Sequence, residues 1–247
     1  MFKRRRGIYE QAAPARPELG TRDGVAYALF LPQGQPSAGV VIVHGAGSAK
    51  ESHFDFARAA RAAGMAAVAF DARGHGRSEG AFGPEALDDV RAMCELLRER
   101  GAPAVAIRGS SMGGFCAIHA AALDHAVAAV VAICPAPEDF LLRGLRNESL
   151  EGFRADRDRL EPWLEGLNLG DAAASLAPRC ALLIMHAEGD EQIPYTLSQE
   201  LFMRAGDPKR LLLIPGGHHR SIQHDPELQS EAVRFIRKAV AAREQHH

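Results

Sequence analysis

A serine with a glycine two residues away on either side stands near the middle of the chain. Residues 109–114 read Gly-Ser-Ser-Met-Gly-Gly, after an apolar strand-like run at 104–107 and before a helix-like run at 115–123. At such a strand-to-helix turn, the small flanking residues let Ser111 hold a strained backbone and present its hydroxyl as a nucleophile. The same turn puts the amide of Met112 at a helix N-terminus, where it could stabilise an oxyanion.

The spacing alone is weak evidence, because the chain has 24 glycines. A serine hydroxyl also needs a base to take its proton and an acid to orient that base. In open α/β sheets such groups follow the carboxyl ends of strands. Asp190 follows a strand-like run at 181–186, and two adjacent histidines follow another at 210–215. We expect Asp190 as the acid and His219 as the base, with His218 as the alternative base.

Other acids also follow predicted strands. Glu188 and Glu191 flank Asp190, and Asp139 follows the preceding strand. The order serine, acid, histidine along the chain is that of α/β-hydrolases and differs from the order in chymotrypsin-like and subtilisin-like proteases. Position and order fit Asp190, Glu188 and Glu191 alike and rank Asp139 below Asp190.

The elements that must position these residues alternate along the chain. Nearly continuous apolar runs separated by amphipathic runs predict a mostly parallel sheet with helices on both faces. After a hairpin at 20–30, the expected strands are 39–43, 66–71, 104–107, 128–134, 181–186 and 210–215. The expected helices are 51–63, 84–100, 115–123 and 226–242.

One segment, residues 136–177, is too long for a simple crossover between two strands. Its apolar residues recur at helical spacing, at Leu150, Phe153, Leu160, Leu164 and Leu167. We expect a small helical cap inserted into a single domain that spans residues 1–247. The alternative is a crossover helix that packs on the sheet.

Three further motifs carry a resemblance to a known group. They are His-Gly-Ala-Gly at 44–47, Asp-Ala-Arg-Gly-His-Gly-Arg-Ser at 71–78 and Gly-Asp-Glu-Gln-Ile-Pro at 189–194. With the serine turn, they resemble the α/β-hydrolase superfamily, in its esterase and serine aminopeptidase-like (monoacylglycerol-lipase-like) branch, from about residue 20 onward. The resemblance implies that the amides of Ala46 and Met112 form an oxyanion hole. It also favours Asp190 and, through a Gly-x-x-His pattern, His219.

The function that this resemblance implies is a serine hydrolase that cleaves a small-molecule carboxylic ester through an acyl-enzyme. Few aromatic residues, with Trp163 as the only tryptophan, favour small to medium acyl chains. Serine aminopeptidase-like or thioesterase activity is the alternative, and a non-catalytic ligand-binding protein is a further one. A peptidase would need cap carboxylates, for which Glu148, Glu151, Glu161 and Glu165 are available.

Composition limits the remaining classes of function. The net charge is −2, and no apolar run approaches the roughly 18 residues of a membrane span, so neither nucleic acid nor membrane is expected as a partner. Four scattered cysteines without a Cys-x-x-Cys pair predict buried thiols and a cytoplasmic location. No metal-ligand or nucleotide-binding spacing occurs, so we expect neither metal nor cofactor. A homo-oligomer is compatible with the sequence.

Overall fold

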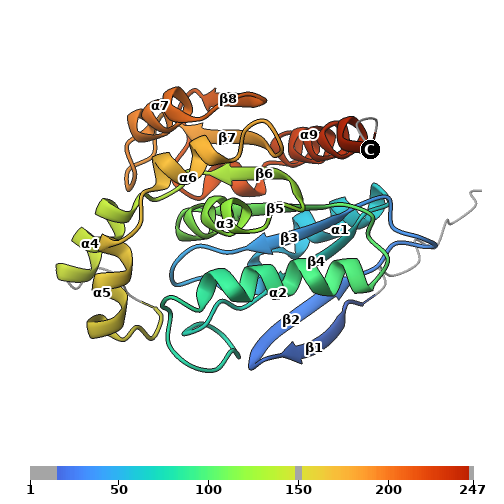
Figure 1. The fold of residues 1–247 in the computed structure, drawn as a ribbon, viewed down its shortest axis with the longest axis horizontal. Helices are drawn as coiled ribbons and strands as arrows, with labels where there is room; N and C mark the ends of the chain where they lie inside the picture. The colour runs from blue at the N-terminus through green and yellow to red at the C-terminus, as the bar shows by residue number, and fades with distance from the viewer. Residues whose placement is uncertain (1–15, 148–151, 245–247) are drawn as a thin grey trace, which may run out of the picture.

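The computed structural model describes residues 16–147 and 152–244. Its centre is an eight-stranded sheet in the order β1-β2-β4-β3-β5-β6-β7-β8 (Figure 1). The strands are β1 Glu18–Arg22, β2 Val25–Phe30, β3 Gly39–Val43, β4 Ala66–Phe70, β5 Val105–Ser110, β6 Val127–Ile133, β7 Ala181–Ala187 and β8 Lys209–Ile214. The β1–β2 hairpin is antiparallel and joins β4 in antiparallel pairing, whereas β3 to β8 run parallel. The predicted α/β fold with a mostly parallel sheet is confirmed.

Helices cover both faces of the sheet. One face packs against α2 Ala86–Glu99, α3 Met112–Leu123 and α7 Tyr195–Arg204, with α6 Leu169–Ser175 lying on α3 and α7, and its core includes Phe115 and Leu97. The other face packs against α1 Phe54–Ala62 and α9 Pro226–Glu244, with Phe56 and Ile236 in its core. Strands β3 to β7 are buried along their whole length, which explains why their sequences are apolar without alternation.

The segment 136–177, which we expected to form one cap, is divided in the structure. Helices α4 Glu138–Arg146 and α5 Arg157–Glu165 pack on each other beyond the strand ends, at the left of Figure 1. Helix α6 instead packs against α3 and against α7 Tyr195–Arg204, as part of the crossover from β6 to β7. Of the five apolar residues at helical spacing, Leu160 and Leu164 are buried on α5, and Leu150 lies outside the described residues.

Two helices were not expected from the sequence. They are α7, which joins β7 to β8, and the short α8 Ser221–His224, which precedes α9. A 3-10 turn at Lys50–His53 also precedes α1, so that helix begins three residues later than predicted. Each of these three elements follows a loop that carries residues of the candidate active site. In such loops, tertiary contacts override the local helix propensity.

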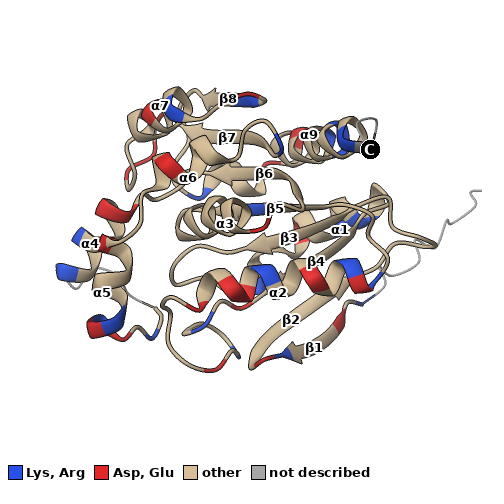
Figure 2. Ribbon diagram, viewed as in Figure 1, with Lys and Arg blue, Asp and Glu red and all other residues tan. Residues whose placement is uncertain are grey.

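Charged residues lie mainly on the outer surfaces of the helices and on the edge strands (Figure 2). All four cysteines are unpaired and buried. Within residues 16–147 and 152–244, no helix has the length and apolar character of a membrane span.

Candidate active site

The turn between β5 and α3 strains Ser111 as the sequence predicted. Ser111 has φ 54° and ψ −121°, a conformation that residues with side chains rarely adopt. A Cβ on Gly109 would lie 2.0 Å from the carbonyl oxygen of Gly113, and one on Gly113 would lie 2.2 Å from that of Val43. Both positions therefore require glycine. The backbone N–H of Ser111 donates to Ile133 of the adjacent strand (2.8 Å), which holds the turn in place.

The loop after β3 lies directly against this serine. A Cβ on Gly45 would be 3.2 Å from the Cβ of Ser111. In the same loop, the amides of Gly47 and Ser48 are hydrogen-bonded, at 3.2 Å to His75 Nε2 and 3.2 Å to the Gly45 carbonyl. Among the described residues, no hydrogen-bond acceptor is found for the amide of either Ala46 or Met112. Two free N–H groups beside the serine are what an oxyanion hole requires.

Two buried histidines fix the shape of that loop. His44 Nε2 accepts a hydrogen bond from the Ala72 amide (3.0 Å), so its Nδ1 carries the proton and donates to the Gly45 carbonyl (2.7 Å). His75 Nε2 accepts from the Gly47 amide, and the two imidazole centroids are 4.8 Å apart. Burial lowers the pKa of His44 to about 4 and also lowers the pKa of His75, so both rings are neutral at pH 7.

A buried ion pair connects the loop after β3 to the loop after β4. Asp71 accepts hydrogen bonds from Lys50 Nζ (2.6 Å), the Lys50 amide (2.9 Å) and the Arg77 amide (2.9 Å). The Lys50 and Asp71 side chains are 4% and 1% exposed. Burial alone would raise the pKa of Asp71, but the bonds from Arg77 and Lys50 outweigh it and lower that pKa. The motif at 71–78 thus supports the candidate oxyanion loop and leaves catalysis to other groups.

The acid and the base meet at the ends of β7 and β8. His219 Nδ1 lies 2.7 Å from Asp190 Oδ2. The two loops are joined by a hydrogen bond from the Gly189 amide to the Gly216 carbonyl (2.9 Å). A Cβ on Gly189 would lie 2.4 Å from the Gly217 carbonyl oxygen, so this close approach requires glycine. Because β5, β7 and β8 are parallel, Ser111 lies at the same edge of the sheet as this pair.

Asp190 is held ionised by an unusual number of donors. Besides His219, its carboxylate receives the amides of Gln192 (2.9 Å) and Ile193 (2.8 Å) and lies 3.2 Å from His186 Nε2. Burial would raise the pKa of Asp190, but the bonds from His186, His219, Ile193 and Gln192 together hold it well below its usual range. A carboxylate that remains charged can orient the imidazole and stabilise an imidazolium.

Two members of this cluster were missed from the sequence. His186, near the end of β7, is fully buried, and its Nδ1 pairs with the Ser198 hydroxyl of α7 (2.7 Å). Cys134, just after β6, has φ 43° and brings its Sγ within 4.8 Å of ligand atoms of Asp190 and His219. The position of each at a predicted strand end was the available signal.

Cys134, Asp190 and His219 are residue types that can also bind a metal ion. In this arrangement the His219 ring is already hydrogen-bonded to Asp190, and burial raises the pKa of the Cys134 thiol. The geometry therefore fits an acid–base pair with a protonated thiol beside it.

The rival residues lie elsewhere. His218 is exposed, and its backbone and Nδ1 close a local turn with Ser221 and Arg220. Glu191 accepts a hydrogen bond from the backbone amide of His219, at 3.1 Å, and makes none with its ring. Glu188 is exposed, and Asp139 is exposed in the first turn of α4. The structure therefore brings Asp190 together with His219 and leaves His218 outside the pair.

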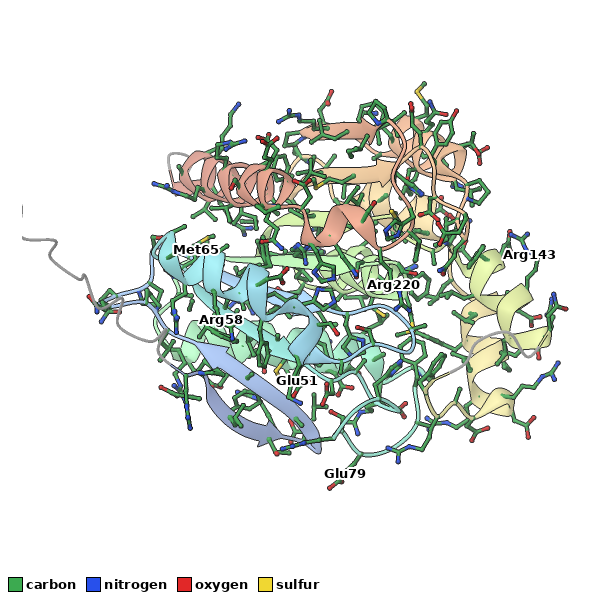
Figure 3. All side chains as sticks on the ribbon, turned by 180° about the vertical axis from the view of Figure 1, so that it is seen from behind. Glu51, Arg58, Met65, Glu79, Arg143 and Arg220 are labelled. Carbon is green, nitrogen blue, oxygen red and sulfur yellow. The ribbon has the colours of Figure 1, made fainter. Side chains whose placement is uncertain are left out.

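The cap segment closes over the candidate oxyanion loop. A Cβ on Gly152 would lie 2.9 Å from the Gly47 Cα. Phe153 stacks on His75 (ring centroids 4.6 Å apart), and Trp163 of α5 makes edge contacts with Phe82 and Phe115 of the main body. Farther out, Arg143 of α4 points away from the sheet (Figure 3).

The cap arginines mostly bind neighbouring acids. Arg146 pairs with Glu161 (2.6 Å) and Glu165 (2.5 Å), and Arg159 pairs with Glu85. These pairs make the outer face of the cap a solvated, charge-balanced surface. They also occupy two of the carboxylates that a peptidase could use, while Glu148 and Glu151 lie outside the described residues.

A strained serine after β5, an acid after β7 and a histidine after β8 are the arrangement typical of an α/β hydrolase. The fold is that of the α/β hydrolases, as the similarity to solved α/β-hydrolase structures shows. The family model described as serine aminopeptidase, S33 matches residues 34–141, a stretch that includes Ser111 and ends before Asp190 and His219.

Several known proteins are similar to the chain. Est1E from Butyrivibrio proteoclasticus, solved with ferulic acid bound, has a TM-score of 0.71 and 19% identity, with 92% of this chain and 99% of Est1E covered. The monoacylglycerol lipase of Paleococcus ferrophilus has a TM-score of 0.66 and 23% identity over 92% of this chain and 99% of the lipase. The uncharacterized protein YfhR of Salmonella typhimurium is 26% identical, with 93% of this chain and 85% of YfhR covered.

Proposed function

We propose that the protein is a serine hydrolase that cleaves carboxylic esters of small to medium acyl chain. The observation that carries the proposal is the 2.7 Å contact between His219 Nδ1 and Asp190 Oδ2, at the same sheet edge as the strained Ser111. Esterase and lipase folds among the similar structures support the same class of reaction.

In this proposal, Ser111 attacks the ester carbonyl carbon while His219 takes the hydroxyl proton. Asp190 keeps the proton of the imidazole on Nδ1, so that Nε2 is free to act as the base. The amides of Ala46 and Met112 bind the oxyanion, and His219 then gives its proton to the leaving alkoxide. Water hydrolyses the acyl-enzyme in a second pass through the same steps. No step needs a metal ion or an organic cofactor.

The preference for shorter acyl chains rests on the packing beneath the cap. Aromatic rings of the cap and the body contact one another next to the candidate oxyanion loop, through Phe153 on His75 and Trp163 on Phe115. Phe115 follows Ser111 by one helical turn, and its amide bonds to the Ser111 carbonyl (3.2 Å). Filled space close to the nucleophile leaves less room for a long acyl chain.

The test is hydrolysis of p-nitrophenyl acetate, butyrate and octanoate by the wild type, Ser111→Ala and Ser110→Ala. Ser110 is buried on β5 and is the matched control for loss of a hydroxyl in this turn. We expect activity at background in Ser111→Ala only, and rates that fall toward octanoate. Equal rates in the wild type and Ser111→Ala would contradict the role of Ser111, and a maximum at octanoate would contradict the acyl-chain preference.

The same protein also tests the bond type. An alanine ester, thioester and p-nitroanilide, compared at equal concentration, separate esterase from thioesterase and aminopeptidase activity. We expect the ester to be the best substrate, because the carboxylates Glu161 and Glu165 are paired with Arg146. A p-nitroanilide turned over faster than the ester would favour the peptidase. Failure to react with a fluorophosphonate probe would favour the non-catalytic alternative.

A further inference from the structure

A groove of about 880 Å³ lies at the opposite edge of the sheet from Ser111. Ala128, Ala181 and Lys209 stand at the amino ends of β6, β7 and β8, and all three line it. Because these strands are parallel, their amino ends are separated from the site edge by the length of a strand, roughly 20 Å. The groove is therefore separate from the candidate active site. Its volume is within the range of small-molecule sites.

The groove combines an apolar floor with a basic rim. Its floor includes Pro178, Pro208, Phe235 and Ala239, and Phe235 and Ala239 remain partly exposed on α9. Six basic residues line it and one acidic residue, Glu231, which pairs with Arg210 and with Arg234. The basic residues are Arg179, Lys209, Arg210, Arg234, Lys238 and Arg243. The chain as a whole has a net charge of −2, so this excess of basic residues is local to the groove.

Two of the arginines are held in place by backbone carbonyls. Arg179 donates to the carbonyls of Ala121 and Ala122, at 3.1 and 3.2 Å, and Arg243 donates to those of His125 and Val127, both at 2.9 Å. A guanidinium has five N–H donors, so two such bonds leave others available to an anion. Carbonyls fix the orientation of these groups without neutralising their charge, which lowers the entropic cost of binding an anion.

We propose that this groove binds a single-chain anionic amphiphile, with its carboxylate at the arginines and its apolar chain along Phe235 and Ala239. Charge complementarity selects the anionic head, and the partly exposed apolar floor selects the chain. A carboxylate that carries an apolar chain is also what hydrolysis of an acyl ester releases. Only this last link rests on the proposed function, because binding can be measured without catalysis.

The test is calorimetric titration of Ser111→Ala with decanoate, and with decyltrimethylammonium as a cation of the same chain length. Two pairs of variants on α9 provide matched controls. Ala239→Trp fills the groove, whereas Ala241→Trp adds the same ring outside it. Lys238→Glu reverses a charge at the rim, whereas Arg237→Glu makes the same reversal at the next residue, which does not line the groove.

We expect decanoate to bind and decyltrimethylammonium to bind at least tenfold more weakly. Ala239→Trp should weaken decanoate binding at least tenfold and Lys238→Glu about three- to tenfold, with the two controls within twofold of the parent. Thermal melting of each variant shows that it is folded. The proposal is overturned if decanoate does not bind, if both amphiphiles bind equally, or if Ala239→Trp binds like Ala241→Trp.

A second measurement separates this groove from the active site. Wild-type protein whose Ser111 has been blocked by a fluorophosphonate should bind decanoate with unchanged affinity. If the blocked protein no longer binds decanoate, the ligand lies in the active site and the proposal is overturned. If blocking removes only the esterase activity, the proposal that the groove binds decanoate stands. Failure of the groove and failure of the proposed function therefore give different results.

Discussion

Breaking the ion pair between Lys50 and Asp71 should destabilise the protein strongly. Asp71→Asn keeps the size of the side chain but removes the charge opposite Lys50 Nζ, which lies 2.6 Å away in a site where both side chains are almost fully buried. Loss of one partner of a buried ion pair costs about 3–5 kcal/mol. Glu51, at 3.1 Å from Lys50 Nζ and largely exposed, offers partial compensation, so we expect about 3 kcal/mol.

The reciprocal change should cost less. Lys50→Met leaves Asp71 with two backbone donors, the amides of residue 50 and Arg77, so we expect a loss of about 1–2 kcal/mol. In the double variant no buried ammonium remains without a partner, and its loss should be smaller than the sum of the single losses. The coupling free energy should be about 2 kcal/mol.

Urea denaturation of the four proteins measures these free energies of unfolding. For a chain of this length, the loss in Asp71→Asn corresponds to a melting temperature about 6–12 °C lower. Two results would refute the reasoning: a loss below about 1 kcal/mol in Asp71→Asn, or losses that add without coupling. Arg91→Met, which removes the exposed pair with Asp88, is the control and should change stability by less than about 1 kcal/mol.

Three further outcomes are expected. Gly113→Ala should unfold the turn or abolish activity, because its Cβ would lie 2.2 Å from the Val43 carbonyl oxygen. Gly83→Ala, whose Cβ would make an ordinary contact of 3.6 Å with Glu85 Oε2, should remain folded, and an active Gly113→Ala would contradict the geometry. The pKa of His44 is lowered to about 4 in the folded protein, against 6.5 when unfolded, so the unfolded chain binds more protons as the pH falls. The free energy of unfolding should therefore decrease by about 2 kcal/mol between pH 7.5 and 5. Urea denaturation of His44→Asn at both pH values should show no such decrease. A pH dependence of the free energy of unfolding equal to that of the wild type would rule out His44 as its source. Asp190→Asn should lower kcat by about 10⁴-fold, whereas Asp139→Asn should leave it within twofold, and comparable losses in both would contradict the assignment of Asp190 as the acid.

The turn at Ser111 and the strands could be predicted from the sequence because local sterics and burial determine them. Gly109 and Gly113 are required wherever a serine stands on so tight a turn, and the contacts with Gly113 O and Val43 O show why. Strands buried on both faces must be apolar throughout, so their order along the chain was visible.

The sequence favoured His219 over His218 only through the Gly-x-x-His resemblance, and for His186 and Cys134 the only signal was their position at predicted strand ends. The roles of these residues depend on how the loops after β6, β7 and β8 meet. The bond from Gly189 to Gly216 sets the register between two loops far apart in sequence, and that register turns His219 toward Asp190.

The cap also shows which features the sequence predicts and which depend on tertiary contacts. Apolar spacing indicated helices between residues 136 and 177, and helices are there. Whether each packs on the body or beyond the strand ends depends on long-range contacts, such as those of α6 with α3 and of α4 with α5. Local chemistry in the sequence thus determined which residues could react and which segments form the sheet. Only the tertiary structure decided which side chains meet, because each meeting depends on contacts between segments distant in the chain.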